Sequence, residues 1–278
     1  MPHAKGNGAS LYYEDTGQGP AIVFLHEYAD DLRSWKSQVG FFSAFYRCLA
    51  FNARGYPPST IPTRPELYGQ EIAVNDIETV LAAAGIDQTY LIGLSMGAAS
   101  ALQFALRNPD RVLGLVAASG GAGADTSTRT GFLKSIGETT NLLRIHGMKA
   151  VVDKYTRTPN RSTLLQKNTA AWKYFQDRFL TLDATGAAFT LENIQGKRTS
   201  LFDEEASLRV LKVPTLLAMG DQDDSILKIN VFLKSTIQDS QLWISPNTGH
   251  AINLEEPDDF NTNILRFFRH IERKASGY

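Results

Sequence analysis

Short apolar runs alternate with longer amphipathic segments in the first part of the chain and again near its end. Strands are expected at residues 10–14, 21–25, 48–51, 89–92, 112–118, 215–219 and 241–244. Helices are expected where apolar residues recur three or four positions apart, at residues 34–46, 70–84, 98–107, 228–237 and 260–273. Strands that alternate with helices of about ten residues or more predict a mostly parallel, twisted sheet flanked by helices, an α/β fold.

This alternation stops between the two halves. Residues 125–208 contain amphipathic helical stretches and no convincing strand. We therefore expect one α/β core formed by residues 1–124 and 209–278, with residues 125–208 inserted as a helical cap, or lid, at one end of the sheet.

The overall composition narrows the class of protein. The chain has 278 residues, a net charge of -1, a hydrophobic content of 43% and a single cysteine. The sequence has no cluster of basic residues typical of nucleic-acid binding and no apolar run long enough to span a membrane. With one cysteine, an intramolecular disulfide is impossible. These features predict a cytoplasmic globular protein, a monomer or homodimer, whose partner is a small molecule.

One motif carries specific chemistry. The run Gly93-Leu94-Ser95-Met96-Gly97 fits the G-x-S-x-G pattern, in which a sharp turn between a strand and a helix pushes a serine hydroxyl out of the sheet. Here the motif follows an expected strand and precedes an expected helix. Ser95 is therefore expected to be a catalytic nucleophile.

A serine nucleophile needs a base and an acid that orients the base. Of the five histidines, His250 lies in a loop directly after an expected strand, where α/β proteins gather their sites. The acid is expected after the strand at 215–219, where Asp221, Asp223 and Asp224 compete. Asp221 lies at the turn and suits a backbone cap, whereas Asp224 suits a helix cap or a solvated position.

These motifs together resemble the α/β-hydrolase superfamily over nearly the whole chain. The matching segments are residues 24–26, 53–55, 93–97, 220–223 and 249–250. The resemblance implies that Asp223 is the acid and His250 the base, and that the backbone N–H groups of Met96 and Tyr28 form the oxyanion hole. The segment after His250 resembles the tail of small esterases and enol-lactonases.

The sequence departs from the family pattern at the oxyanion hole. The family usually has glycine after the histidine of the third strand, and this chain has His26-Glu27-Tyr28. We expect His26 to support this loop and Glu27 to pair with Arg33 or Arg54. Glu27 and two cap aromatics, Phe132 and Trp172, are candidate substrate contacts, although cap aromatics also serve simply to pack the cap on the sheet.

The expected reaction is acyl transfer to water, with a small carboxylic ester or lactone as substrate. Neither an HExxH motif nor a G-x-G-x-x-G motif after a strand occurs, so no metal or cofactor is implied. Three alternatives stay open. The first is a carbon–carbon bond hydrolase of aromatic breakdown, a group that shares the Ser-Met pair but usually has Trp where this chain has Ala251. The others are a cofactor-free haloperoxidase-like or dioxygenase-like enzyme and a ligand-binding receptor that keeps the fold.

Overall fold

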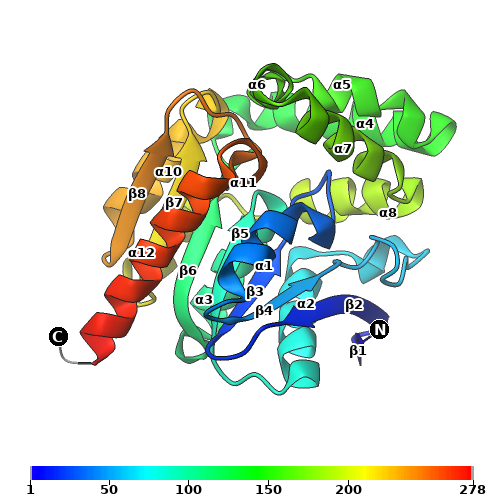
Figure 1. The fold of residues 1–278 in the computed structure, drawn as a ribbon. Helices are drawn as coiled ribbons and strands as arrows, with labels where there is room; N and C mark the ends of the chain where they lie inside the picture. The colour runs from blue at the N-terminus through cyan, green and yellow to red at the C-terminus, as the bar shows by residue number, and fades with distance from the viewer. Residues whose placement is uncertain (1, 277–278) are drawn as a thin grey trace.

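A single sheet organises the molecule (Figure 1). The computed structural model describes residues 2–276, and its eight strands have the order β1-β2-β4-β3-β5-β6-β7-β8. Their bounds are β1 His3–Gly6, β2 Ala9–Thr16, β3 Ala21–Leu25, β4 Arg47–Phe51, β5 Thr89–Leu94, β6 Val112–Ala118, β7 Thr215–Gly220 and β8 Ser240–Ser245. The pairings of β1 with β2 and of β2 with β4 are antiparallel, and the remaining pairings are parallel. The mostly parallel α/β sheet predicted from the sequence is therefore confirmed.

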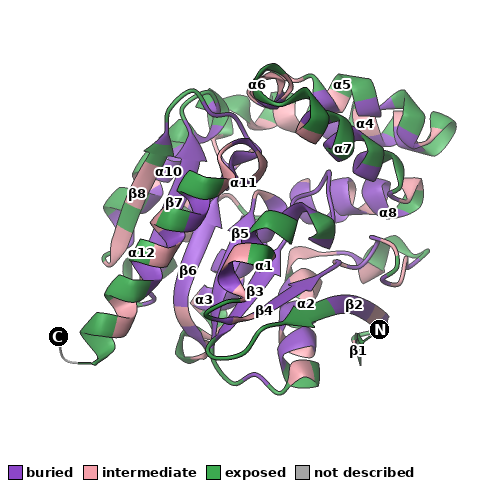
Figure 2. Cartoon of the chain, in the orientation of Figure 1, coloured by how far each residue is buried: buried purple, intermediate pink, exposed green. Residues whose placement is uncertain are grey.

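Helices cover both faces of the sheet, which explains why its inner strands are continuously apolar. In β3, Val23 and Leu25 belong to one buried cluster and Ile22 and Phe24 to another, because successive side chains point to opposite faces. The helices that pack on the first face are α2 Gln70–Ala84, α3 Met96–Arg107 and α10 Leu227–Thr236. Those on the second face are α1 Lys36–Phe42 and α12 Pro257–Ala275. Figure 2 shows the central strands buried along their length.

Two expectations near the N-terminus were wrong. Residues 3–6 form β1, an edge strand that pairs with β2, although the polar sequence there predicted no strand. The helix expected at 34–46 is a 3-10 turn, Leu32–Trp35, followed by α1, which ends at Phe42. The chain then turns toward β4 and leaves Phe45 47% exposed, so the apolar spacing continues beyond the helix itself.

Between β6 and β7 the chain forms helices and contains no strand among the described residues. These elements are α4 Thr126–His146, α5 Val152–Thr156, α6 Pro159–Lys167, α7 Thr169–Leu180, α8 Ala184–Phe189, a π-helical turn Thr190–Gln195 and α9 Glu205–Arg209. Helices α4 to α8 lie together at one end of the sheet (Figure 1). The helical character expected for the cap is present, whereas the division at 125 and 208 stays a prediction.

A third buried cluster joins the cap to the core. Cap side chains such as Phe175 and Phe179 share it with Tyr28, Met96 and Ala251, which follow strands of the sheet. The cap therefore packs on the end of the sheet at which the parallel strands finish. Within residues 2–276, no helix combines the length and the apolar character needed to cross a lipid bilayer.

Candidate active site

Ser95 sits in a strained turn between β5 and α3. Its backbone has φ +54° and ψ −105°, a conformation that L-residues rarely adopt. The turn is held by a 2.8 Å hydrogen bond from the Ser95 N–H to the carbonyl of Ala118 on β6. Glycines at positions 93 and 97 allow the start of α3 to approach β3 and β5, because a Cβ on either would overlap neighbouring backbone. This is the strand–turn–helix geometry that the G-x-S-x-G pattern predicts.

His250 and Asp223 meet across the loops that follow β8 and β7. The Nδ1–H of His250 donates to the Oδ2 of Asp223 at 2.5 Å, and both side chains are buried. Burial favours the neutral form of the Asp223 carboxyl. Its hydrogen bonds and charge interactions with His250, Asn160 and Ser225 outweigh this effect and lower its pKa. An ionised Asp223 fixes the tautomer in which Nε2 of His250 is free to accept a proton.

The two competing aspartates lie elsewhere. Asp221 is exposed and accepts a 3.2 Å hydrogen bond from the N–H of Thr248, which is the backbone-capping role expected for it. Asp224 is exposed and begins a short 3-10 turn, Asp224–Ile226. Of the three carboxylates, Asp223 is the one that contacts His250.

Residues 26–31, which we call the β3 loop, follow β3 at the same edge of the sheet. Nδ1–H of His26 donates to the Glu27 carbonyl at 2.7 Å, and its Nε2 accepts from the Ala53 N–H at 3.0 Å. Burial lowers the pKa of His26. This effect outweighs the opposite influence of Glu27 and Asp31. A neutral imidazole with both nitrogens occupied supports the loop and is not available as a second base.

The two predicted oxyanion donors belong to rigid segments. The Tyr28 carbonyl accepts a 2.9 Å hydrogen bond from the Tyr56 hydroxyl, and the Tyr28 ring packs edge-on against Tyr155 of the cap. Met96 is the first residue of α3, so its N–H has no partner within the helix. In the part of the chain that the structure describes, neither the Tyr28 nor the Met96 N–H donates to a protein acceptor. Their role as oxyanion donors stays a prediction.

The partner expected for Glu27 was wrong. Arg33 pairs with Asp31 and Arg54 with Asp76, whereas Glu27 forms a two-pronged ion pair with Arg161 of α6. The contact is bidentate: Nη1–H of Arg161 donates to Oε1 of Glu27 at 2.9 Å, and Nη2–H of Arg161 donates to Oε2 of Glu27. The arginines nearest to Glu27 in the sequence belong to the core and were therefore expected to pair with it. In the folded protein an arginine of the cap lies closer to Glu27.

Both members of this pair are buried, with side chains 1% and 5% exposed. Burial alone would raise the pKa of Glu27. The charge and hydrogen bonds of the Arg161 guanidinium more than compensate, so the pKa of Glu27 is lowered and the carboxylate stays ionised. A second cap arginine, Arg178 of α7, pairs with Asp30 of the same loop at 2.5 and 2.6 Å.

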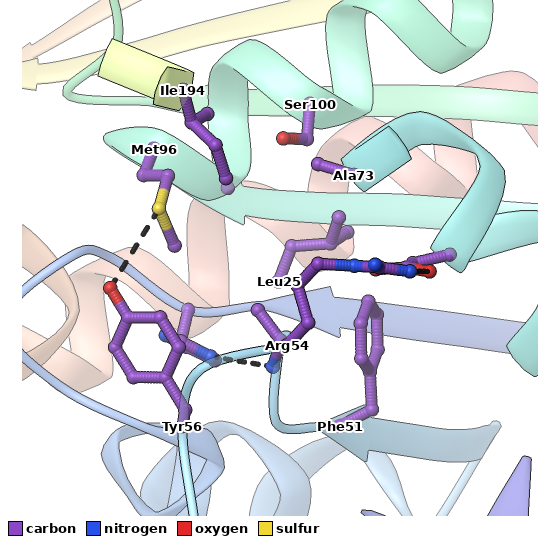
Figure 3. A pocket seen from close by; sticks show the side chains of 12 residues that line it. Leu25, Phe51, Arg54, Tyr56, Ala73, Met96, Ser100 and Ile194 are labelled. Carbon is purple, nitrogen blue, oxygen red and sulfur yellow. Dashed lines mark hydrogen bonds and ion pairs between the residues drawn. The ribbon is translucent and has the colours of Figure 1, made fainter. Parts of the chain in front are cut away.

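A small cavity lies beside the elbow (Figure 3). Its volume is about 30 Å³, and its lining is mostly apolar. Figure 3 shows Met96 and Tyr56 at one side of it, joined by a contact between the tyrosine hydroxyl and the methionine sulfur, and Arg54 at the other. This space fits about one water molecule and is too small for a substrate.

The two cap aromatics proposed as substrate contacts pack against other parts of the protein. Trp172 belongs to α7 and is buried, and its indole N–H donates to the carbonyl of Thr156 at the end of α5 at 3.2 Å. Phe132 lies against Gly123 and below the Arg129 guanidinium. Neither lines the cavity beside the elbow, and their contact with substrate stays a prediction.

Comparison with known proteins agrees with this geometry. A sequence profile of the family described as alpha/beta hydrolase fold matches residues 20–257. The chain belongs to the alpha/beta hydrolase fold family.

Several relatives of this chain are named as hydrolases. The 2-hydroxy-6-oxo-6-phenylhexa-2,4-dienoate hydrolase of Burkholderia cepacia is 27% identical over 273 residues, covering 92% of this chain and 90% of that protein. Epoxide hydrolase 2 of Siraitia grosvenorii is 38% identical over 111 residues, which cover 40% of this chain and only 35% of the relative. Among solved structures, the enol-lactonase of Burkholderia xenovorans has a TM-score of 0.84 at 24% identity, covering 96% of this chain and 100% of that one, and shows the shared fold.

Sequence reasoning missed a cap residue of this alpha/beta hydrolase. The side-chain amide of Asn160 donates to Oδ1 of Asp223 at 3.0 Å, and the backbone carbonyl of Asn160 accepts a 2.7 Å hydrogen bond from the backbone N–H of His250. Asn160 lies at the start of α6, in a polar stretch with no distinguishing motif. The sequence did contain a hint of the role of its neighbour Arg161. Glu27 stands where the family usually has glycine, and a buried carboxylate there needs a cationic partner. Among residues 2–276, no group of three or more His, Cys, Asp or Glu side chains is arranged to hold a metal ion.

Proposed function

We propose that this protein is a serine hydrolase that cleaves a small carboxylic ester or lactone through an acyl-enzyme. Ser95 is the nucleophile, His250 the general base and acid, and Asp223 the carboxylate that orients His250. The observation that carries the proposal is the buried 2.5 Å contact between His250 and Asp223, in loops at the edge of the sheet where the Ser95 turn also lies.

The chemistry follows the order of the proton transfers. Nε2 of His250 takes the proton of Ser95 as its Oγ attacks the substrate carbonyl, and the N–H groups of Met96 and Tyr28 donate to the developing oxyanion. The protonated His250 then gives this proton to the leaving alkoxide, which departs as an alcohol. Water, deprotonated by His250, hydrolyses the resulting ester of Ser95 and releases the acid.

A second candidate reaction comes from the relatives. The 2-hydroxy-6-oxo-6-phenylhexa-2,4-dienoate hydrolase aligns with 92% of this chain, and this similarity favours a carbon–carbon bond hydrolase of the same fold. The residue after His250 counts against this candidate, because it is Ala251 where that group usually has tryptophan. We therefore place ester or lactone cleavage first, in keeping with the similarity in fold to an enol-lactonase and an esterase.

The test is covalent labelling and turnover. A fluorophosphonate probe is expected to label Ser95 in the folded protein, and p-nitrophenyl acetate is expected to be hydrolysed. Ser95→Ala is expected to abolish labelling and to lower kcat by about 10⁴-fold or more, because the covalent route is lost. Its melting temperature should stay close to that of the wild type.

Either of two results would overturn the proposal. Hydrolysis that persists in Ser95→Ala would show that another group performs the chemistry. A folded wild-type protein that is neither labelled nor active on esters would favour the ligand-binding receptor.

A further inference from the structure

Glu27 presents its carboxylate to the free nitrogen of His250. Oε2 of Glu27 lies 3.9 Å from Nε2 of His250, while Nδ1 of the same ring is occupied by Asp223. The side chains of Glu27 and His250 are 1% and 6% exposed, so bulk water screens this pair little. The imidazole therefore has one buried carboxylate on each side.

Arg161 fixes the orientation of Glu27 without using all of its acceptor sites. Each carboxylate oxygen receives one guanidinium N–H, although a carboxylate offers about four lone-pair sites in total. Arg161 is itself held between the rings of Tyr155 and Phe175, with its guanidinium carbon 4.8 and 5.3 Å from their centroids. One acceptor site of Oε2 thus stays free beside a rigidly held pair.

A separation of 3.9 Å is too long for a direct hydrogen bond, but it suits two acceptors that share one water molecule. A water at hydrogen-bond distance from both atoms would donate one hydrogen to Oε2 and the other to Nε2. Its remaining lone pairs would then be directed away from both acceptors.

We propose that Glu27 is a positioning residue for the water that hydrolyses the acyl-enzyme. This inference rests on the proposed serine hydrolase function. The water gives one proton to Nε2 of His250 while its oxygen bonds to the carbonyl carbon of the Ser95 ester. The tetrahedral intermediate collapses, the bond from that carbon to Oγ breaks, Oγ takes the proton back from His250, and the acid is released.

This role affects one of the two chemical steps. In acylation, His250 takes its proton directly from Ser95, so no bridging water takes part. In deacylation, the attacking water must be oriented, and a misplacement of about 1 Å can cost about 10²-fold in rate. Loss of the Glu27 carboxylate removes a charge beside the imidazolium in both steps and the acceptor for the water only in deacylation, so deacylation should slow more than acylation.

The variant Glu27→Gln reverses the polarity that the water meets. Both oxygens of Glu27 accept from Arg161, so the amide N–H₂ of the variant replaces one of these acceptors, and at the Oε2 position it faces both a guanidinium N–H and His250. An N–H₂ group donates and cannot accept a hydrogen from the water. We expect a stopped-flow burst of about one p-nitrophenolate per active site from p-nitrophenyl acetate, followed by a steady rate about 10²-fold lower than in the wild type.

A matched control is available in the same loop. Asp30→Asn alters another buried carboxylate that pairs with a cap arginine, Arg178, and has no ion pair with His250 among the described residues. It should perturb the contact between loop and cap in a similar way and leave the ratio of deacylation to acylation within about threefold of the wild type. Added hydroxylamine, a stronger nucleophile than water, should restore turnover in Glu27→Gln.

The outcomes separate this inference from the function on which it rests. Unchanged deacylation in Glu27→Gln, or an equal loss in acylation and deacylation, overturns the positioning role while wild-type labelling of Ser95 still supports the hydrolase. Absence of labelling and turnover in the wild type overturns the proposed function instead. If Glu27→Gln does not fold, the double variant Glu27→Leu, Arg161→Met removes both buried charges and every acceptor at this position, and it should show the same burst and slow steady rate.

Discussion

At the scale of single residues, the site depends on how each polar atom near His250 is occupied. Asp223 accepts from three different side chains, those of His250, Asn160 and Ser225, and these contacts keep it ionised despite burial. The neighbouring aspartates have the same charge but are exposed and directed at other groups. Residue type alone does not distinguish the three, because the distinction lies in what each carboxylate contacts.

This difference predicts unequal effects of two similar substitutions. Asp223→Asn should lower kcat for ester hydrolysis by about 10⁴-fold, because an amide stabilises the wrong tautomer of His250 and does not stabilise the imidazolium. Asp224→Asn is the control and should retain activity within about twofold. Steady-state assays on p-nitrophenyl acetate measure both, and a similar loss in the two variants would contradict the assignment of the acid.

At the scale of elements, the junction of β5 and α3 decides whether Ser95 is presented at all. The turn places Ser95 at positive φ, and the first turn of α3 lies directly against the end of β3. A Cβ at Gly97 would overlap the carbonyl oxygen of Leu25, which is backbone and cannot rotate away. The close packing of strand and helix therefore requires the glycine.

We predict that Gly97→Ala lowers the free energy of unfolding by about 3 kcal/mol and abolishes labelling of Ser95, because α3 must move away from β3. Gly137→Ala, within α4, is the matched control. Apart from the adjacent residues and the backbone of α4 itself, no atom lies within 4 Å of a Cβ there, so the substitution should stabilise the protein by about 0.5–1 kcal/mol through helix propensity. Urea unfolding measures both changes, and a neutral Gly97→Ala would show that α3 is not held at this distance.

At the scale of the whole molecule, the cap is joined to the core by buried charges as well as by apolar packing. Glu27 and Asp30 of the β3 loop pair with Arg161 and Arg178 of the cap. The same α6 segment contacts Asp223 and His250 through Asn160. The cap therefore contributes to the geometry of the site as well as covering it.

The Asp30–Arg178 pair allows a double-mutant test of this attachment. Asp30→Asn and Arg178→Met should each lower the free energy of unfolding by about 3–5 kcal/mol, since each leaves a buried charge without its partner. The double variant should lose less than the sum of the two. As a control, Arg209→Gln removes an exposed pair with Glu205 and should change the free energy by less than about 1 kcal/mol. Additive losses in the cycle would mean that the two charges are not coupled.

The fold was largely predictable because its determinants are local and periodic. Helix α2 begins and ends where the sequence predicted, since apolar spacing defines its face and Gly85 at φ +65° ends it. Strand β1 was missed because it is a short, polar edge strand whose stabilisation comes from pairing with β2. The helix predicted at 34–46 was too long. Phe45 continues the helical spacing of apolar residues, but its side chain is exposed and lies beyond the end of α1.

The sequence by itself determined the alternation of strands and helices and the elbow at Ser95, because both depend on residues adjacent in the chain. Only the tertiary structure decided that Glu27 pairs with Arg161 and that Asn160 supports Asp223, which are contacts between residues 134 and 63 positions apart. No local pattern encodes such pairs. A buried charge takes the partner that the packing of cap on core brings within reach, and that packing depends on apolar surfaces contributed by the whole chain.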